Sequence, residues 1–173
     1  MKYLALLLCS LVLSTVTVAK QSPITELNIT HITQQHDHVF TAGQPDQQQF
    51  AELAKKGIKT VINLRDDSEI SWSEQDVVEQ LGMRYFNIPV SNKDDINLDN
   101  AKQLYSLLQS HSNSGVLLHC ASSNRVGALV AIYQALALNK PVDDAIAIGK
   151  QWGLKSLETV VAQQIEEAQT RDP

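Results

Sequence analysis

The chain has 173 residues, enough for one domain of ordinary size with a hydrophobic core of its own. Hydrophobic residues make up 43% of it and charged residues 19%, which is typical of a soluble globular protein. The formal net charge is −5, and no basic run interleaves with aromatic residues, so the sequence argues against nucleic acid as a partner. An anionic ligand would have to be bound by local hydrogen-bond donors, because the electrostatic field of a negatively charged protein does not attract it.

Residues 1–19 have the layout of a secretory signal peptide. A short positive start precedes an apolar run over residues 3–13, and the segment ends on small residues up to Ala19. The run is too short for a membrane-spanning helix, so we predict cleavage after Ala19 and a periplasmic or secreted product. An uncleaved anchor is the alternative, and lipidation of Cys9 is disfavoured because three leucines precede it. Cleavage would leave one domain, residues 20–173, without stable membrane insertion.

The beginning of this domain shows short strand patterns. Spaced apolar residues over 21–33 and again at 39–40 indicate two short strands or a hairpin around the polar segment 34–38. His36 and His38 alternate and would share a strand face as metal ligands. No further ligand cluster accompanies them, so a solvated turn is the prediction there.

Strands and helices then alternate, with connections of a few residues. Strands are predicted over residues 59–64, 85–90 and 116–118. The first predicted helix begins at an Asp46 cap and ends at Gly57, and the next two cover residues 73–81 and 98–110. Further helices begin at Gly127 and at Pro141. The last covers residues 157–170 and is capped by Ser156. This order predicts an α/β domain with a central, mainly parallel sheet flanked by helices. Ligands bind such sheets at the carboxyl ends of strands, so the loops at 65–68, 91–97 and 120–125 should meet on one rim.

Residues 115–127, GVLLHCASSNRVG, combine a buried strand, a polar loop from Cys120 to Arg125 and a helix that is apolar on nearly every face. Such a helix start directs backbone N–H groups at the loop, where they attract anions and stabilise a thiolate. Arg125 adds a planar fork of donors suited to oxyanions. After signal cleavage Cys120 is the only thiol, so no internal disulfide can form, and its polar flanks argue against an inert buried cysteine. The pattern predicts a cysteine nucleophile facing an oxyanion.

A cysteine attacks phosphorus as a thiolate, and the transferred group needs donors for its equatorial oxygens and an acid for the leaving group. The helix start, Arg125 and the hydroxyls of Ser122 and Ser123 are the candidate donors. A neighbouring loop supplies Asp94 and Asp95, either of which could be the acid. A solvated loop at a helix entry is the alternative for both aspartates.

The pattern HC, a short loop and Arg resembles the cysteine-dependent protein tyrosine phosphatase superfamily, in its dual-specificity branch. Five residues normally separate Cys from Arg there, whereas four separate Cys120 from Arg125 here. The shorter loop is similar to that of the bacterial beta-lactamase hydrolase-like, phosphatase-like family, whose pattern is HCxSGxR. Three further segments resemble landmarks of that family, so the resemblance covers most of the mature chain: TAGQP at 41–45, GIKTVINLRDDSE at 57–69 and YFNIPV at 85–90.

The resemblance implies a dual-specificity phosphatase-like fold and hydrolysis of phosphate monoesters, on a phosphorylated protein or small molecule, through a phosphocysteine intermediate. Cys120 would be the nucleophile and Arg125 the phosphate clamp, while His119 would orient the loop and favour the thiolate. The anion would be cradled by the peptide groups of Ala121, Ser122, Ser123 and Asn124. Nothing in the sequence implies a metal or an organic cofactor.

The loop departs from the family pattern at two positions. Ser123 stands where the family has glycine, which costs the loop some freedom to adopt positive φ. Val126 stands where many tyrosine phosphatases have Ser or Thr beside the thiolate, so Ser122 is the expected substitute.

The acid position departs as well. The usual aspartate of dual-specificity enzymes aligns near Asn92, which leaves Asp94 and Asp95 as offset candidates. Arg65 and Asp66, at the end of the strand at 59–64, are interpreted as a structural pair.

Two other classes of protein fit part of the pattern. Rhodaneses share the four-residue spacing in a CxxGxR loop and would carry a persulfide on Cys120, and a small loop suits a sulfur atom better than a phosphate. The flanking landmarks favour the phosphatase-like family, and Ser123 removes the rhodanese glycine too. A non-catalytic module that binds phosphate or a phosphoprotein is the third possibility. The sequence does not identify a physiological substrate.

Overall fold

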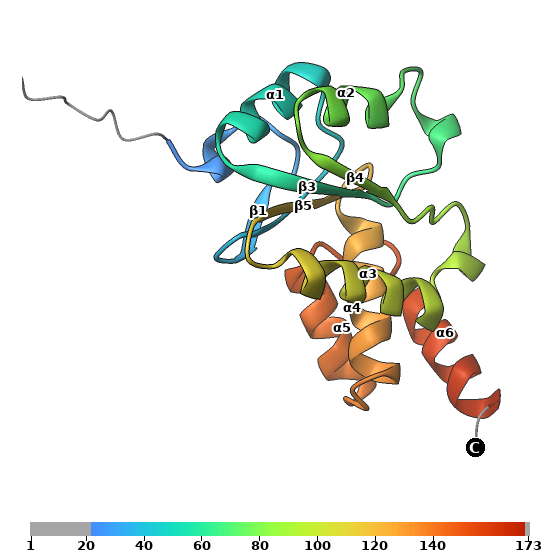
Figure 1. Ribbon diagram of the computed structural model, residues 1–173. Coiled ribbons are helices and arrows are strands. Elements are labelled where there is room, and N and C mark those ends of the chain that lie inside the picture. The colour runs from blue at the N-terminus through green and yellow to red at the C-terminus, as the bar shows by residue number, and fades with distance from the viewer. Residues whose placement is uncertain (1–21, 172–173) are drawn as a thin grey trace, which may run out of the picture.

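Five strands form one sheet in the order β1-β2-β5-β3-β4 in the computed structural model, which describes residues 22–171 (Figure 1). The strands are β1 (Thr33–His36), β2 (Val39–Ala42), β3 (Ile58–Asn63), β4 (Arg84–Asn87) and β5 (Gly115–His119). β1 pairs antiparallel with β2, and all other neighbours are parallel. The predicted mainly parallel sheet is therefore confirmed, with β5 in its centre.

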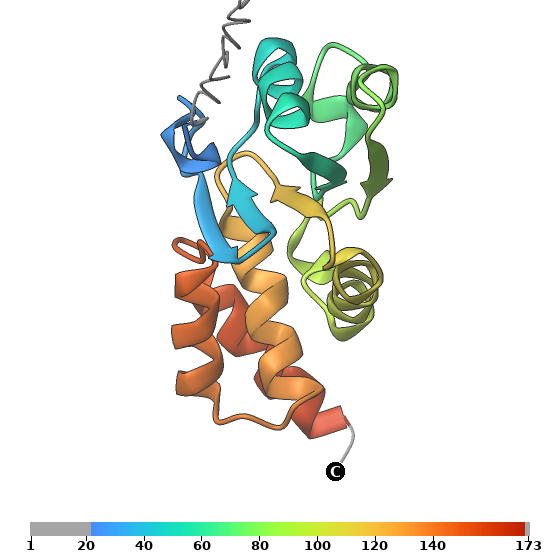
Figure 2. The same cartoon turned by 60° about the vertical axis from the view of Figure 1, so that its left-hand side comes forward.

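Helices cover both faces of the sheet, as Figures 1 and 2 show. The helices are α1 (Gln47–Lys55), α2 (Glu74–Gln80), α3 (Leu98–His111), α4 (Asn124–Leu136), α5 (Val142–Gln151) and α6 (Glu158–Arg171). The described residues also form three 3-10 turns: η1 (Ile24–Glu26) before β1, η2 (Asp67–Glu69) between β3 and α2, and η3 (Lys93–Asp95) between β4 and α3. α1 and α2 lie on one face, and α4 packs against α3, α5 and α6 on the other (Figure 2).

Alternation along the strands divides the core into two apolar clusters. In β5, Leu118 faces the larger cluster with α3 to α6, whereas Leu117 faces the smaller one with Phe50 of α1 and Val78 of α2. The central strands β2, β3 and β5 are largely buried, as parallel strands covered on both faces require, whereas the edge strands β1 and β4 are exposed or half-buried. α4 is buried along most of its length, as its uniformly apolar pattern predicts.

Glycines allow α4 and the segment after α5 to approach closely. A Cβ atom added at Gly127 would lie 2.1 Å from the backbone nitrogen of Leu154 and 2.5 Å from the carbonyl oxygen of Gly149. Gly153 has a φ of +105°, and a Cβ atom there would lie 2.5 Å from the Cβ of Ser123. These contacts fix the start of α4, and the loop in front of it, against the connection between α5 and α6.

Some element boundaries differ from the prediction. β1 lies largely within the segment 34–38 that was predicted to be a turn, because the hairpin turns at Asp37 and His38. The strand predicted over 85–90 ends at Asn87, since Pro89 has no N–H to donate to the sheet.

Ser156 does not cap the last helix. α6 begins at Glu158, and the Ser156 hydroxyl accepts a hydrogen bond of 2.7 Å from Asn124 Nδ2. The helix that Pro141 opens is confirmed, with Pro141 at its N-cap position.

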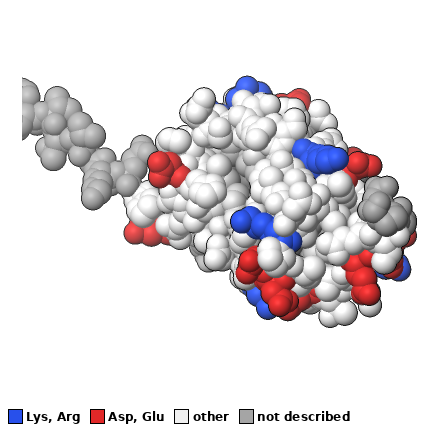
Figure 3. Space-filling view, turned by 90° about the horizontal axis from the view of Figure 1, so that it is seen from below, with Lys and Arg blue, Asp and Glu red and all other residues white. Residues whose placement is uncertain are grey.

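Residues 1–19, predicted to be a signal peptide, lie outside the described residues. Among residues 22–171, no helix is both long enough and apolar enough to span a membrane. The surface drawn in Figure 3 is largely uncharged, with acidic and basic side chains interspersed.

Candidate active site

The predicted nucleophile lies at the centre of the carboxyl edge of the sheet. Cys120 follows β5 directly, and only 1% of it is exposed. The chain continues through Ser122, which forms an antiparallel bridge with Gly43 beyond β2. α4 begins at Asn124, so Arg125 belongs to its first turn; the prediction had ended the loop at Arg125 and begun the helix at Gly127. Cys120 and Arg125 therefore stand on either side of a helix N-terminus, where backbone N–H groups lack partners within the helix.

Ser123 adopts the left-handed conformation that the glycine of the family pattern would favour. Its φ is 66° and its ψ −8°, and it precedes the first residue of α4. The left-handed conformation costs a residue with a Cβ atom about 1–2 kcal/mol of conformational free energy. The Ser123 hydroxyl is buried and has no hydrogen-bond partner among residues 22–171. The loop thus holds Ser123 in a conformation that its own chemistry does not favour.

The other loop residues present mainly their backbone. The Asn124 side chain is bonded to the connection between α5 and α6. Its Nδ2 donates to the Ser156 hydroxyl, and its Oδ1 accepts a hydrogen bond of 2.7 Å from the backbone N–H of Lys155. Ala121 is exposed, and Val126 is fully buried. The cradle of peptide groups at residues 121–124 stays a prediction.

A carboxylate that the sequence interpretation gave no role holds the Arg125 guanidinium. Arg125 Nη1 and Nη2 lie 2.6 and 2.8 Å from Oε1 and Oε2 of Glu69, and Nη1 also lies 3.3 Å from the Leu64 carbonyl oxygen. Hydrogen bonding from Arg125, against some opposing desolvation, lowers the pKa of Glu69 to about 2. The same pairing raises the pKa of Arg125, so both groups are charged at neutral pH.

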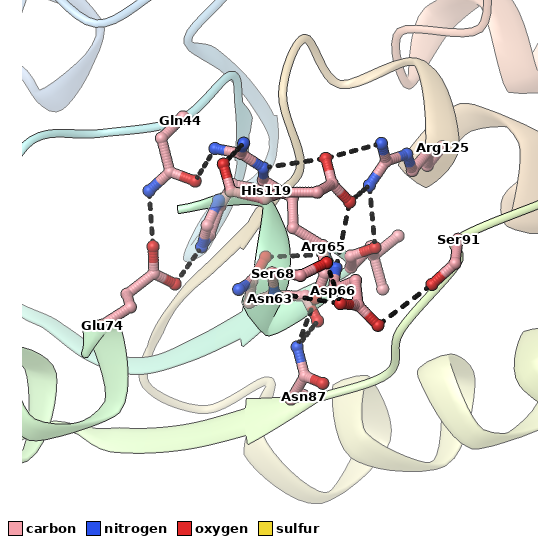
Figure 4. A network of polar contacts seen from close by, with 12 residues as sticks. Gln44, Asn63, Arg65, Asp66, Ser68, Glu74, Asn87, Ser91, His119 and Arg125 are labelled. Carbon is pink, nitrogen blue, oxygen red and sulfur yellow. Dashed lines mark hydrogen bonds and ion pairs between the residues drawn. The ribbon is translucent and has the colours of Figure 1, made fainter. Parts of the chain in front are cut away.

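Arg65 also pairs with Glu69, and the predicted Arg65–Asp66 pair is wrong. Arg65 donates from Nε to Glu69 Oε2 at 3.2 Å and from Nη2 to the Glu69 carbonyl oxygen at 2.7 Å. Asp66 instead caps η2, accepting from the N–H and hydroxyl of Ser68, and these bonds lower its pKa. Its second oxygen accepts from the Ser91 hydroxyl at 3.2 Å, which joins two loops of the rim (Figure 4).

His119, immediately before the nucleophile, pairs with a buried glutamate. Its Nε2 lies 2.8 Å from Glu74 Oε1, and both side chains are at most 1% exposed. Gln44 Nε2 donates to the other Glu74 oxygen at 2.5 Å (Figure 4). The ring of Phe50 stands nearly edge-on to the His119 ring, 5.8 Å between centroids. The imidazole is thus held from two sides, as a loop-orienting role requires.

The two predicted acid candidates lie in η3, on the loop after β4. Asp95 Oδ2 accepts from the backbone N–H of Ser91 at 2.8 Å and of Asn92 at 3.0 Å, so it stabilises its own loop. Asp94 is exposed, and its backbone N–H donates to the Asn92 side chain. Within residues 22–171 neither carboxylate is hydrogen-bonded to Cys120 or Arg125. Their role as general acid stays a prediction.

Sequence reasoning missed three side chains of this site. Gln44 and Glu69 lie within the landmark segments at 41–45 and 57–69, but those segments carried no residue roles. Glu74 occupies the first turn of α2, where glutamate is normally solvated and serves the helix dipole. It carried no local signal, because its partner His119 lies 45 positions further along the chain.

The described residues contain no group of three or more His, Cys, Asp and Glu that could hold a metal ion. His36 ends β1 and packs against Trp152 at 5.6 Å between ring centroids, and His38 lies in the hairpin turn. The two histidines therefore do not share a strand face. His36 has a packing role, and His38 belongs to the turn.

Solved structures share this fold. A DUF442 protein from Shewanella putrefaciens CN-32, described as a phosphatase candidate, matches with a TM-score of 0.60 at 23% identity, over 88% of this chain and 98% of that one. TpbA from P. aeruginosa, in complex with pTyr, matches with a TM-score of 0.56 at 16% identity, over 84% and 86%. The expected dual-specificity phosphatase-like fold is confirmed by these structures and by kinase-associated phosphatase, with a TM-score of 0.58 at 14% identity.

Relatives in sequence agree with the fold. The beta-lactamase hydrolase-like protein of Xylella fastidiosa strain Temecula1 is 26% identical over 123 residues, and that of strain 9a5c matches equally. The match covers 68% of this chain but only 28% of the Xylella protein. A phosphatase family described as DSP-PTPase phosphatase fused to NAD+ kinase matches residues 14–171. The resemblance to phosphatases is thereby confirmed, and the chain belongs to this DSP-PTPase family.

Proposed function

We propose that this chain is a cysteine-dependent phosphatase that hydrolyses phosphate monoesters through a phosphocysteine intermediate. Family membership and fold make it phosphatase-like. The observation that supports the cysteine mechanism is the placement of Cys120 and Arg125 on either side of the N-terminus of α4. A thiolate, a helix start and a guanidinium together suit a phosphate dianion.

In the first step the Cys120 thiolate attacks phosphorus in line with the leaving oxygen. The S–P bond forms as the P–O bond breaks, and the leaving alkoxide or phenoxide takes a proton from an acid. The N–H groups of residues 121–124 hold the equatorial oxygens. Asp94 and Asp95, on the loop after β4, are the proposed acids.

In the second step water attacks phosphorus and the P–S bond breaks. Inorganic phosphate leaves, Cys120 returns as thiolate, and the conjugate base of the acid takes the proton from water. Glu69 holds both terminal nitrogens of Arg125, whereas Arg125 Nε has no hydrogen-bond partner among the described residues. We therefore expect phosphate to approach from the Nε edge of a guanidinium whose plane is already fixed.

The proposed substrate is a phosphorylated protein or small molecule. The fold shared with TpbA, solved with pTyr, supports an aryl phosphate as the first substrate to test. Export through residues 1–19 is part of the proposal, and it would place the substrate outside the cytoplasm.

The test compares wild-type protein with Cys120→Ser and Arg125→Lys, on an aryl phosphate and on thiosulfate with cyanide. The proposal predicts phosphate release that Cys120→Ser abolishes and that Arg125→Lys strongly reduces, because lysine keeps the charge but loses the planar fork. Thiocyanate formation without phosphate release would instead identify a sulfurtransferase. Absence of both reactions, with phosphopeptide binding retained by Cys120→Ser, would identify a binding module.

A further inference from the structure

Six side chains form one continuous series of polar contacts from Arg125 to His119, the residues at the two ends of the Cys120 loop (Figure 4). In order they are Arg125, Glu69, Arg65, Gln44, Glu74 and His119. The links nearest Gln44 are 2.6 Å from Arg65 Nη1 to Gln44 Oε1 and 2.5 Å from Gln44 Nε2 to Glu74 Oε2. The series connects the predicted phosphate clamp to the residue beside the predicted nucleophile.

The chemistry of the groups fixes the direction of every link. Arginine only donates, so Gln44 must turn its carbonyl oxygen to Arg65 and its NH₂ to Glu74. An ionised Glu74 only accepts, so the bond to His119 is donated by Nε2–H. The orientation of one amide thus matches the donors of Arg65 to the acceptor oxygens of Glu74, and through Glu74 it selects the His119 tautomer.

Burial makes the contribution of Gln44 large. Glu74 is 2% exposed and His119 is fully buried. Among the described residues the Glu74 carboxylate has two hydrogen-bond partners, Gln44 and His119. A buried carboxylate that loses one of two donors loses part of the compensation for its desolvation, and its hydrogen bond to the remaining donor changes.

We propose that Gln44 is a positioning residue of the Cys120 loop, which orients Glu74 and thereby His119, and joins them through Arg65 and Glu69 to Arg125. The role rests on the proposed phosphatase function for its kinetic consequence. The side-chain hydrogen bonds of Gln44 within residues 22–171 go to Pro45, Glu74 and Arg65 and not to Cys120, so it acts through its neighbours. The geometry predicts that changing this one amide disturbs both ends of the loop.

Replacing Gln44 with glutamate gives a test that depends on pH. The new carboxyl group can still accept from Arg65, but when ionised it places a negative oxygen against Glu74. When one proton is shared between the two carboxyl groups, the missing donor is restored. The charged and titratable groups that face this pair are Arg65 and Glu69 from the η2 segment, His119 from β5 and Tyr85 from β4. Burial raises the pKa of Tyr85 to about 12, so Tyr85 stays neutral throughout the range tested.

The experiment uses the full chain with Gln44→Glu, Gln44→Met and the control Gln75→Glu. Gln75 also donates to a glutamate, Glu79, at 2.9 Å, but on the exposed face of α2. For each variant kcat on an aryl phosphate and the rate of Cys120 alkylation by iodoacetamide, identified by peptide mapping, are measured between about pH 5 and 8. Near-UV circular dichroism checks that each variant is folded.

We expect Gln44→Met to lower kcat roughly tenfold, by a factor that does not change with pH. Gln44→Glu should match that loss at the alkaline end and recover toward wild type as the pH falls, with alkylation following the same trend. Gln75→Glu should follow the wild type throughout. If Gln44→Met does not fold, the pH-dependent recovery of Gln44→Glu carries the test alone.

The proposal is overturned if both Gln44 variants behave as wild type, or if the ratio of Gln44→Glu to wild type is the same at every pH. A wild-type protein without phosphatase activity would refute the proposed function. The alkylation profiles would then still decide whether Gln44 controls the surroundings of Cys120.

Discussion

Acid should destabilise the folded domain through Glu69. Its carboxylate accepts hydrogen bonds from both terminal nitrogens of Arg125 and one more from Arg65. The hydrogen bonding from Arg125 is the largest cause of the low pKa of Glu69. The pKa is about 2 in the folded protein against an ordinary value of 4.5. Because the folded value is the lower one, the stabilisation is complete above about pH 4.5 and is lost as the pH falls toward 2.

The size of the effect follows from that difference. Each pKa unit corresponds to about 1.4 kcal/mol, which gives an upper limit of about 3 kcal/mol. Solvent reaches 25% of the Glu69 side chain and screens the pair, so we expect about 1–3 kcal/mol. Glu69→Gln should lower the free energy of unfolding at neutral pH by that amount, because it leaves a partly buried Arg125 without its counter-charge.

Urea unfolding of wild type and Glu69→Gln at several pH values between about 7 and 3 measures this contribution. The difference between the two proteins isolates Glu69 from other carboxylates that titrate in acid, and it should shrink as the pH falls. Glu79→Gln is the matched control, since Glu79 is exposed on α2 and accepts from Gln75. A difference that stays constant with pH, or no difference at neutral pH, would refute the assignment of the low pKa to the Arg125 pair.

Other substitutions test the loops around Cys120. Asp95→Asn weakens the acceptor for two backbone N–H groups and should cost about 1 kcal/mol in thermal unfolding, whereas Asp94→Asn should leave stability unchanged. Whichever aspartate is the acid, its Asn variant should slow an alkyl phosphate more than an aryl one, and equal effects on both substrates in both variants would exclude them. Ser123→Gly should raise stability by about 1 kcal/mol, since it relieves the positive φ; a loss of stability would contradict the strain. Gly127→Ala should cost about 2 kcal/mol or more in urea unfolding, because its Cβ would collide with Leu154, and a neutral result would show that α4 can shift.

Most helices and strands of the fold could be predicted from local sequence patterns. The apolar run of β5 and the uniformly apolar α4 were predicted from their residues, because burial on all sides requires that composition. The predicted cap at Asp46 also matched, since its side chain accepts from a backbone N–H only three residues away. The start of α4 was placed too late because Asn124 and Arg125, although helical, are polar and resemble a loop.

Pairings between distant residues could not be predicted. Glu69 lies 56 positions before Arg125 and Glu74 lies 45 positions before His119, so only the folded sheet brings them together. Arg65 was given the wrong partner for a related reason, because the adjacent Asp66 is the nearest opposite charge in sequence. In the structure the 3-10 turn η2 brings the Glu69 carboxylate to the Arg65 guanidinium instead. Serine in place of the family glycine was expected to cost the loop freedom at positive φ, yet Ser123 adopts a φ of 66°, which its residue type alone could not predict.

The account depends on a covalent intermediate at Cys120, and mass spectrometry of the acid-quenched reaction tests it most directly. Wild type and Cys120→Ser would be mixed with an aryl phosphate, quenched within the first turnovers and mapped by peptide. The account predicts one phosphoryl group on the peptide that carries Cys120 in the wild type and none in Cys120→Ser. Phosphate release without any adduct on Cys120, or undiminished release by Cys120→Ser, would contradict the proposed mechanism.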